Sequence, residues 1–185
     1  MQRQEKIEEA LVRKYPEQVV LVVTRGTDGR ANVMAVGWTA IASGDPLIFM
    51  LAIDEAAYTY ELIRKTKSFV VAFPSESMAA AVLHAGSVHG HQRDKLAETG
   101  LATAPARHVA APLLADAVAN FECELAEIAH PGDCPLVFGR VVAAHVNSDP
   151  GLRRLYTVGP GHTMGGVRVA PDTIVRPQAG KGQPQ

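Results

Sequence analysis

The sequence predicts a mainly β protein, in which antiparallel strands close into a barrel and helices are inserted between some of the strands. Long apolar or alternating runs joined by tight turns favour such a barrel. A doubly wound parallel sheet fits less well, because the alternation of strands and helices that it requires fails at both ends of the chain.

Length, charge and cysteine count limit the class of protein to which this chain can belong. The 185 residues are enough for one domain that buries roughly 70% of its unfolded surface. The 18 basic and 19 acidic residues nearly balance, so charge gives no case for binding nucleic acid or an anionic membrane. Two cysteines are too few for a disulfide framework, and no four-ligand zinc spacing occurs, so we expect no metal. The charged start has no apolar signal core and no run reaches the ~20 apolar residues of a membrane span, which favours the cytoplasm.

We expect three parts along the chain. Residues 1–15 hold a short polar helix over residues 3–14, which Tyr15-Pro16 ends. Residues 16–170 form the barrel domain, and residues 171–185 form a flexible tail rich in Pro, Gly, Gln and Lys. The helix has one narrow apolar face, made by Ile7, Leu11 and Val12.

The first strands are expected to pair as hairpins. Residues 19–24 are a continuous, largely β-branched run, typical of a strand buried on both faces. The Asp-Gly turn in residues 27–30 leads to a strand over residues 32–42. A turn at residues 43–46 then separates this strand from a further one over residues 46–53.

The strand over residues 32–42 has an unusual composition, because one large ring, Trp38, stands among small side chains. Small side chains on a strand let a flat group approach the backbone closely. Asn32 and Thr39 add polar groups at the edges of this platform. The alternative is an ordinary core strand with a buried tryptophan.

A helix is predicted over residues 58–65, and Thr59 lies near its N-terminus. Free backbone amides and the helix dipole favour an anion such as phosphate there, although Thr59 could equally cap the helix. A buried strand over residues 68–73 and an alanine-rich helix over residues 76–84 follow.

Residues 86–100 begin as a Gly/Ser-rich loop and end in a short helix over residues 93–99, closed by Gly100. The segment has a local cationic bias in a chain that is neutral overall, from His89, His91, Arg93 and Lys95. Such a loop could hold a phosphate or pyrophosphate, and a solvated surface loop fits the residues equally well.

Two long strands follow, over residues 119–129 and 136–146, joined by a turn at residues 131–133. The first alternates between two faces, one of which carries Asn120, Glu122, Glu124 and Ala126.

Together these segments resemble the flavin reductase-like family, the FMN-binding split-barrel proteins that include flavoredoxins, from about residue 15 to residue 166. The most specific pieces of the match are Asn-Val-Met-Ala-Val-Gly-Trp (32–38), Tyr-Thr-Tyr-Glu-Leu-Ile (58–63), Gly-Ser-Val-His-Gly (86–90) with Asp-Lys-Leu-Ala-Glu-Thr-Gly (94–100), and Phe-Gly-Arg-Val-Val-Ala-Ala-His-Val (138–146). The resemblance implies an antiparallel FMN-binding split β-barrel with helical insertions.

The resemblance also implies roles for particular residues. Asn32 and Trp38 match positions beside the flavin, and the backbone of Val33, Met34 and Ala35 lies along the ring system. Thr59 matches a position that binds the FMN phosphate or ribityl chain, Lys95 matches a lysine near the phosphate, and Ser87 lies in the same loop. Family members are usually homodimers with FMN sites at the subunit interface, so we expect a homodimer.

Two departures from the family pattern flank the face where a hydride donor or substrate would approach. Cys134-Pro135 stands where relatives often carry a histidine and a small polar residue, and His162 stands where an aromatic residue is common. Cys134 is either a redox-active thiol or an inert strand-end cysteine. His162 either contacts the flavin or substrate or lies in solvent.

The implied reaction is hydride transfer from NADH or NADPH to FMN, then electron delivery to free flavin, an acceptor protein or oxygen. The flavin performs this chemistry, so no side chain need act as acid or base. No Gly-x-Gly-x-x-Gly fingerprint occurs, so the nicotinamide cofactor would bind only transiently.

Three alternatives stay open. The first is an FMN-binding electron carrier or flavin store without NAD(P)H oxidase activity. The second is a metal-dependent hydrolase that uses His84, His89 and His91, and the third is a barrel that only binds partners.

Overall fold

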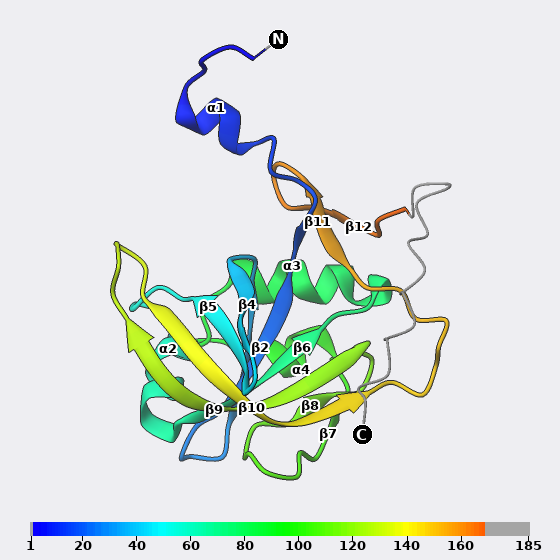
Figure 1. Ribbon diagram of the computed structural model, residues 1–185. Coiled ribbons are helices and arrows are strands. Elements are labelled where there is room, and N and C mark those ends of the chain that lie inside the picture. The colour runs from blue at the N-terminus through cyan, green and yellow to red at the C-terminus, as the bar shows by residue number, and fades with distance from the viewer. Residues whose placement is uncertain (1, 169–185) are drawn as a thin grey trace, which may run out of the picture.

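A seven-stranded antiparallel sheet forms the body of the protein, in the order β3-β2-β6-β9-β10-β5-β4 (Figure 1). The computed structural model describes residues 2–168. The edge strands β3 and β4 follow one another in the sequence with only Gly37 and Trp38 between them, so the sheet nearly closes on itself. The strands are β2 (Val20–Arg25), β3 (Ala31–Val36), β4 (Thr39–Gly44), β5 (Leu47–Ala52), β6 (Ser68–Phe73), β9 (Ala119–Ala129) and β10 (Leu136–Val146).

Two small sheets and a few helices complete the described residues. One small sheet joins segments distant in sequence, namely β1 (Glu17–Gln18), β11 (Tyr156–Gly159) and β12 (Thr163–Gly165). The other pairs β7 (Thr103–Ala104) with β8 (Leu113–Leu114). The helices are α1 (Ile7–Leu11), α2 (Tyr58–Thr66), the 3₁₀ turn η1 (Glu76–Met78), α3 (Ala79–Ser87) and α4 (Lys95–Thr99).

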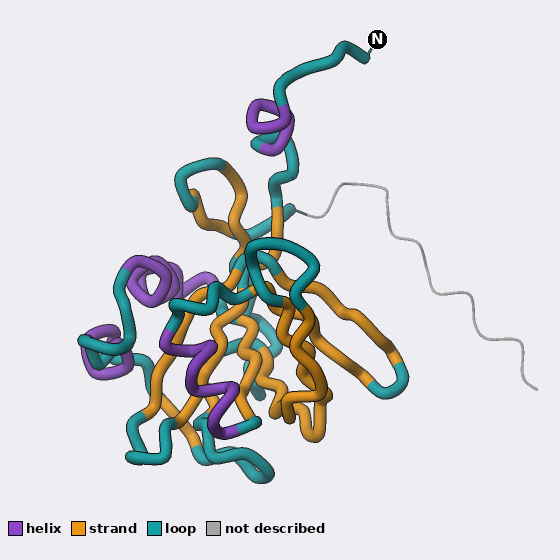
Figure 2. Tube along the Cα trace, turned by 90° about the vertical axis from the view of Figure 1, so that its left-hand side faces the viewer, coloured by secondary structure: helices purple, strands orange, loops and turns teal. Residues whose placement is uncertain are grey.

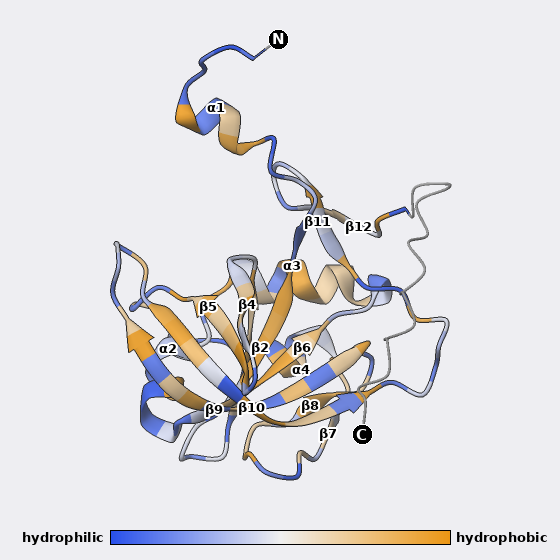
Figure 3. Cartoon of the chain, viewed as in Figure 1, coloured by the Kyte–Doolittle hydropathy of each residue, from blue (hydrophilic) through white to orange (hydrophobic). Residues whose placement is uncertain are grey.

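The sheet is buried on both faces, because successive side chains of its central strands point to opposite sides. One set packs inside the barrel, where α2 closes the interior with Tyr60 and Ile63. The other set packs beneath α3 and the segment 101–118. Figure 3 shows the resulting apolar colour along β2 and over much of α3. This double burial explains the continuous apolar runs of the sequence.

Most of the expected elements are confirmed. The helix over residues 58–65 is α2, the strand over residues 68–73 is β6, and the two long strands are β9 and β10. The Asp-Gly turn connects β2 to β3, and the turn at residues 43–46 connects β4 to β5. The alanine-rich helix runs further than expected, so that Gly86 and Ser87 belong to α3 and not to a loop.

The single strand expected over residues 32–42 is wrong. The chain forms β3, which pairs with β2, then breaks at Gly37 and Trp38 and continues as β4, which pairs with β5. The break turns the Trp38 side chain outward, and 59% of its surface is exposed. The alternative of a buried core tryptophan is therefore wrong as well.

The N-terminal helix is also shorter than expected. The pattern predicts residues 3–14, whereas α1 has five residues and buries none of them. It lies away from the barrel in both views (Figure 1 and Figure 2). Short helices without tertiary packing are marginal in water, which accounts for the lost turns. The expected tail, residues 171–185, lies outside the described residues.

A buried carboxylate fastens the segment 101–118 to the sheet. Glu122 lies in the middle of β9 and is fully buried. Its oxygens accept hydrogen bonds from the amides of Arg107 (2.9 Å), His108 (2.6 Å) and Val109 (2.9 Å), and His145 Nε2 lies 2.6 Å away. Burial pushes the pKa of Glu122 up, but these bonds prevail and lower it from 4.5 to about 2.

We predict that Glu122→Gln lowers the free energy of unfolding at pH 7 by about 3 kcal/mol, since the charged form is favoured in the folded protein. The stabilisation by Glu122 is complete above pH 4.5 and is lost as the pH falls towards about 2. Urea unfolding between pH 2.5 and 7, with windows of roughly 0.5 unit, measures both effects. The matched control is Glu124→Gln on the same strand, whose half-exposed ion pair with Arg140 contributes at most about 1 kcal/mol. Equal effects of the two substitutions would contradict this account.

Candidate functional site

Two adjoining cavities lie between the edge strand β3 and helix α3. The Trp38 cavity has about 270 Å³ and the Thr59 cavity about 220 Å³. Both are lined by Met34, Gly86 and Ser87, so the two cavities adjoin. Together they fall in the range of roughly 300–1,000 Å³ that is typical of small-molecule sites.

Small residues allow α3 to approach β3 closely enough to form this slot. A Cβ atom at Gly86 would lie 3.4 Å from the Cβ of Ala35. Val82 and Ala85 of α3 are buried in the core that also holds Val33 of β3. The close approach that the small residues of the sequence predict therefore exists, but it lies between a strand and a helix.

The Trp38 cavity has mainly apolar walls and a polar rim. Its walls include Val19, Val82, Leu83 and Met164, and Trp38 stands at its edge. The rim contains Glu17, Thr157 and His162, which the small sheet of β1, β11 and β12 supplies. A flat apolar group fits such a space, with polar contacts available only at one side.

The Thr59 cavity contains the start of helix α2. The N-cap residue is Ala57, whose side chain offers no acceptor to the first-turn amides. The alternative that Thr59 caps the helix is therefore wrong, since its hydroxyl oxygen accepts a hydrogen bond from Asn32 Nδ2 at 2.9 Å. An uncapped helix start favours an anion, because its amides and dipole present partial positive charge.

Asn32 lies behind Thr59 at this end of the cavity and contacts it through the hydrogen bond to its hydroxyl oxygen. Its Nδ2 also lies 3.4 Å from Thr24 Oγ1, and its Oδ1 is buried without a hydrogen-bond partner. An unpaired buried oxygen is unfavourable by roughly 1–3 kcal/mol, a cost that the folded protein bears at this end of the cavity. Gly90 packs directly on this amide.

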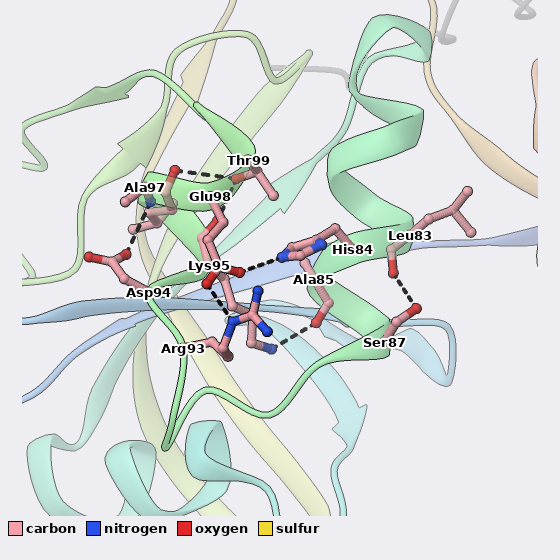
Figure 4. Close-up of polar contacts among 11 residues, drawn as sticks. Leu83, His84, Ala85, Ser87, Arg93, Asp94, Lys95, Ala97, Glu98 and Thr99 are labelled. Carbon is pink, nitrogen blue, oxygen red and sulfur yellow. Dashed lines mark hydrogen bonds and ion pairs between the residues drawn. The ribbon is translucent and has the colours of Figure 1, made fainter.

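Lys95 brings a buried cation to the same cavity. Only 4% of its surface is exposed, and its Nζ donates a hydrogen bond to the carbonyl of Ala85 at 2.8 Å (Figure 4). Burial lowers its pKa from 10.5 to about 8. The Asp94 side chain caps α4 by accepting from the Ala97 amide at 3.1 Å, which fixes the position of Lys95.

Ion pairs hold the helix of Lys95 against α3. Glu98 of α4 contacts His84 of α3 at 2.7 Å and also pairs with Arg93 (Figure 4). Ser87 ends α3, where its hydroxyl donates to the carbonyl of Leu83 at 2.7 Å. Ser87 therefore faces both cavities with its acceptor capacity still available.

The structure brings most of the sequence-predicted site residues together. Those that line one or both cavities are Met34, Ala35, Trp38, Thr59, Ser87, Lys95 and His162. Asn32 reaches the site through Thr59, and the side chain of Val33 points into the core.

Cys134 is not among the residues that line either cavity. It is half-buried in the turn before β10. Burial raises the pKa of its thiol, and the charges of Asp54 and Asp133 act in the same direction. A reactive cysteine requires the opposite shift, so the environment favours the inert alternative.

Sequence reasoning missed several residues of the site. Glu17, Thr157 and Met164 come to the rim through the pairing of β1 with β11 and β12, which no local pattern reveals. Tyr58 and Gly90 line the Thr59 cavity, and both stand inside motifs that the sequence had singled out. An aromatic residue and a glycine beside polar groups are the signal by which these two residues could have been found in the sequence.

The histidines of the hydrolase alternative have separate partners. His84 pairs with Glu98, whereas His91 lies 3.2 Å from Glu61. Within residues 2–168, no group of three or more His, Cys, Asp or Glu side chains could hold a metal ion. In the same range, no helix has the length and apolar character needed to cross a membrane.

The chain matches a family model and resembles known proteins in sequence and in fold. A family model for the flavin reductase like domain matches residues 12–159. An uncharacterized protein of Pyrococcus abyssi is 38% identical over 129 residues, which cover 70% of this chain and 73% of that protein.

Two solved structures resemble the chain over almost its whole length. An FMN-binding protein from Thermus thermophilus, solved with bound p-hydroxybenzaldehyde, is 27% identical, with a TM-score of 0.77 over 92% of this chain and 99% of that one. A flavoredoxin from Methanosarcina acetivorans has a TM-score of 0.81 at 21% identity, over 96% and 97% of the two chains. This likeness confirms the expected split-barrel fold.

We predict that Gly90→Ala disturbs the Thr59 cavity. A Cβ atom at this position would lie 2.1 Å from Asn32 Oδ1 and 3.0 Å from Tyr58 Cδ1, so Asn32 must move away from Thr59. We expect the free energy of unfolding to fall by about 1–3 kcal/mol in urea titrations. Gly132→Ala is the control, because its Cβ would meet no atom within 4 Å. Equal stability of the two variants would show that Gly90 is not packed as described.

Proposed function

Since the chain belongs to the flavin reductase like domain family, we propose that it is an FMN-binding oxidoreductase that takes a hydride from NADH or NADPH. The proposal rests on one observation above all. Two adjoining cavities provide a mainly apolar slot and, next to it, an anion-favouring end, as a ligand with a flat ring and a phosphate requires.

The residues present fit FMN. The slot between β3 and α3 accommodates a ring system, with the β3 backbone at Met34 and Ala35 along one side and Trp38 at the edge. The first-turn amides of α2, Thr59 and Lys95 would hold the phosphate. Close to the phosphate end, the buried Oδ1 of Asn32 is an acceptor without a hydrogen-bond donor.

When bound, FMN supplies the two-electron chemistry, accepting a hydride and releasing electrons to an acceptor. The chain's own residues bind and orient the ring, and the apolar walls exclude water from it. Glu17 and His162 stand at the rim, where a second molecule would approach, and Thr157 is buried beside them. His162 is exposed there, in the turn between β11 and β12.

Lys95 has two roles in this proposal, one structural and one electrostatic. Its ammonium group ties α4 to the end of α3 through Ala85, and it lends positive charge to the phosphate end. Because burial already lowers its pKa to about 8, a bound phosphate would also relieve part of the unfavourable burial of this charge. The homodimer, the acceptor and the cytoplasmic location stay predictions.

We expect the FMN-loaded protein to lose its visible flavin absorbance when it is mixed with NADH or NADPH without oxygen. Stopped-flow spectroscopy follows the bleaching, and free FMN at the same concentration is the control. If neither nucleotide bleaches the bound flavin, the chain is an electron carrier or flavin store. A protein that stays colourless after incubation with FMN would contradict the cofactor itself.

We predict that Lys95→Met weakens FMN binding about 10- to 150-fold at pH 7, the equivalent of a lost charge-assisted hydrogen bond of about 1.5–3 kcal/mol. Wild-type affinity should also fall as the pH rises above about 8, where Lys95 of the free protein loses its proton. The variant should lack this pH dependence. Titrations of flavin fluorescence measure both effects. Lys6→Met, an exposed position beside α1, is the control, and unchanged affinity of Lys95→Met would refute the role.

A further inference from the structure

The 88–94 loop joins the end of α3 to the start of α4. Ser87 and Lys95 stand at its two ends (Figure 4), and both line the Thr59 cavity. Three residues of the loop line the same cavity, namely Val88, His89 and Gly90. The loop is therefore a wall of the anion-favouring end, and its position decides how far that end is enclosed.

Arg30 fastens this loop to the hairpin of β2 and β3. Its Nη2 donates a hydrogen bond to the carbonyl oxygen of Gly90 at 2.8 Å. Its guanidinium group also lies over the ring of Tyr58, 5.1 Å from the ring centre. Tyr58 begins α2 and lines the Thr59 cavity. One side chain thus connects the turn before β3, the first residue of α2 and the loop.

The loop has few other attachments. The ring of His91 lies 4.6 Å from that of Tyr58, and its Nε2 lies 3.2 Å from Oε2 of Glu61. Within residues 2–168, this last contact and the Arg30–Gly90 bond are the only hydrogen bonds from residues 88–92 to elements other than α3 and α4. Gly90 is buried, but its neighbours His89 and His91 are exposed. A segment with so few buried contacts opens at a low cost in free energy.

Arg30 itself is not among the residues that line either cavity. Its effect on a ligand would therefore pass through the loop that it holds. A phosphate on the first-turn amides of α2 and Lys95 would share its cavity with Gly90, the residue to which Arg30 is bonded. Opening of the loop removes one wall of that cavity, so the loop controls exchange of the ligand.

We propose that the 88–94 loop is a lid over the anion-favouring end, and that Arg30 is the positioning residue that holds the lid closed. The inference rests on the proposed FMN site and concerns how long the ligand stays bound. Breaking the Arg30–Gly90 bond favours the open form, from which the ligand leaves. The dissociation rate is therefore the quantity that Arg30 controls.

The first test measures FMN exchange on the full chain. We expect Arg30→Met to raise the dissociation rate on the order of tenfold, because it removes a charge-assisted bond that solvent partly screens. The association rate at about 0.2 M salt, where exposed charges are screened, should stay close to that of the wild type. Stopped-flow flavin fluorescence, on mixing and on dilution, gives both rates.

Arg25→Met is the matched control for this test. Arg25 belongs to the same hairpin and donates to the carbonyl oxygen of Ala110 at 2.8 Å, so the substitution removes the same charge and the same kind of bond. It lines neither cavity and does not contact the loop. Equal dissociation rates for the two variants would overturn the proposal.

A second readout requires no flavin. Trypsin can cleave after Arg93 only when the loop opens, so the cleavage rate follows the open population. We expect Arg30→Met to speed this cleavage on the order of tenfold. Cleavage after Arg140, in the middle of β10, reports global unfolding and should not change.

The two readouts together separate the possible failures. Faster FMN release with unchanged cleavage after Arg93 would show that Arg30 acts on the ligand and would overturn the lid. Equally faster cleavage after Arg93 and Arg140 would show a general loss of stability and would overturn it as well. If wild-type protein binds no FMN while Arg30→Met still speeds cleavage after Arg93 alone, the proposed function fails and the attachment of the loop by Arg30 stands.

Discussion

The close contact between helix α3 and strand β3 is the constraint on which the candidate site depends. Gly86 lies against Ala35, and a Cβ atom added at Gly86 would already be in van der Waals contact with the Cβ of Ala35. Because protein interiors are closely packed, such a shift would alter both cavities, which share Met34, Gly86 and Ser87. The contact is maintained from behind by Val82 and Ala85 in the core, and from the side by α4 through Lys95.

The anion-favouring end is built from groups that the free protein satisfies only in part. Lys95 is buried and its ammonium group donates to the carbonyl of Ala85, Asn32 Oδ1 has no hydrogen-bond partner, and α2 begins without a side-chain cap. Each arrangement is unfavourable by itself, because buried polar groups lose their contacts with water. Lys95 and the start of α2 line the Thr59 cavity and Asn32 lies behind it through Thr59, which is the physical argument for a charged, hydrogen-bonding ligand there. Glu122, by contrast, is buried with hydrogen bonds to both of its carboxylate oxygens.

The rim of the Trp38 cavity depends on contacts between distant parts of the chain. Arg154 lies 4.1 Å from the ring centre of Phe73 and donates a hydrogen bond to Gln18 at 2.9 Å, which joins the small sheet to the barrel. Glu17, Thr157 and His162 are brought to the rim by that sheet. The polar groups of this rim are therefore placed by long-range pairing, whereas the residues of the anion-favouring end stand inside motifs that are visible in the sequence.

Elements with local signals could be predicted from the order of the residues. Alternation and tight turns identified β6, β9, β10 and the hairpin at Asp28-Gly29, and helical spacing identified α2 with Thr59 in its first turn. The break at Gly37 and Trp38 depends on the folded chain, because strand pairing on two different partners divides a run that is continuous in sequence. The folded chain also buries Lys95 and brings Glu17 and Thr157 to the rim. Burial and long-range pairing depend on residues far apart in the chain, so no local pattern could reveal them.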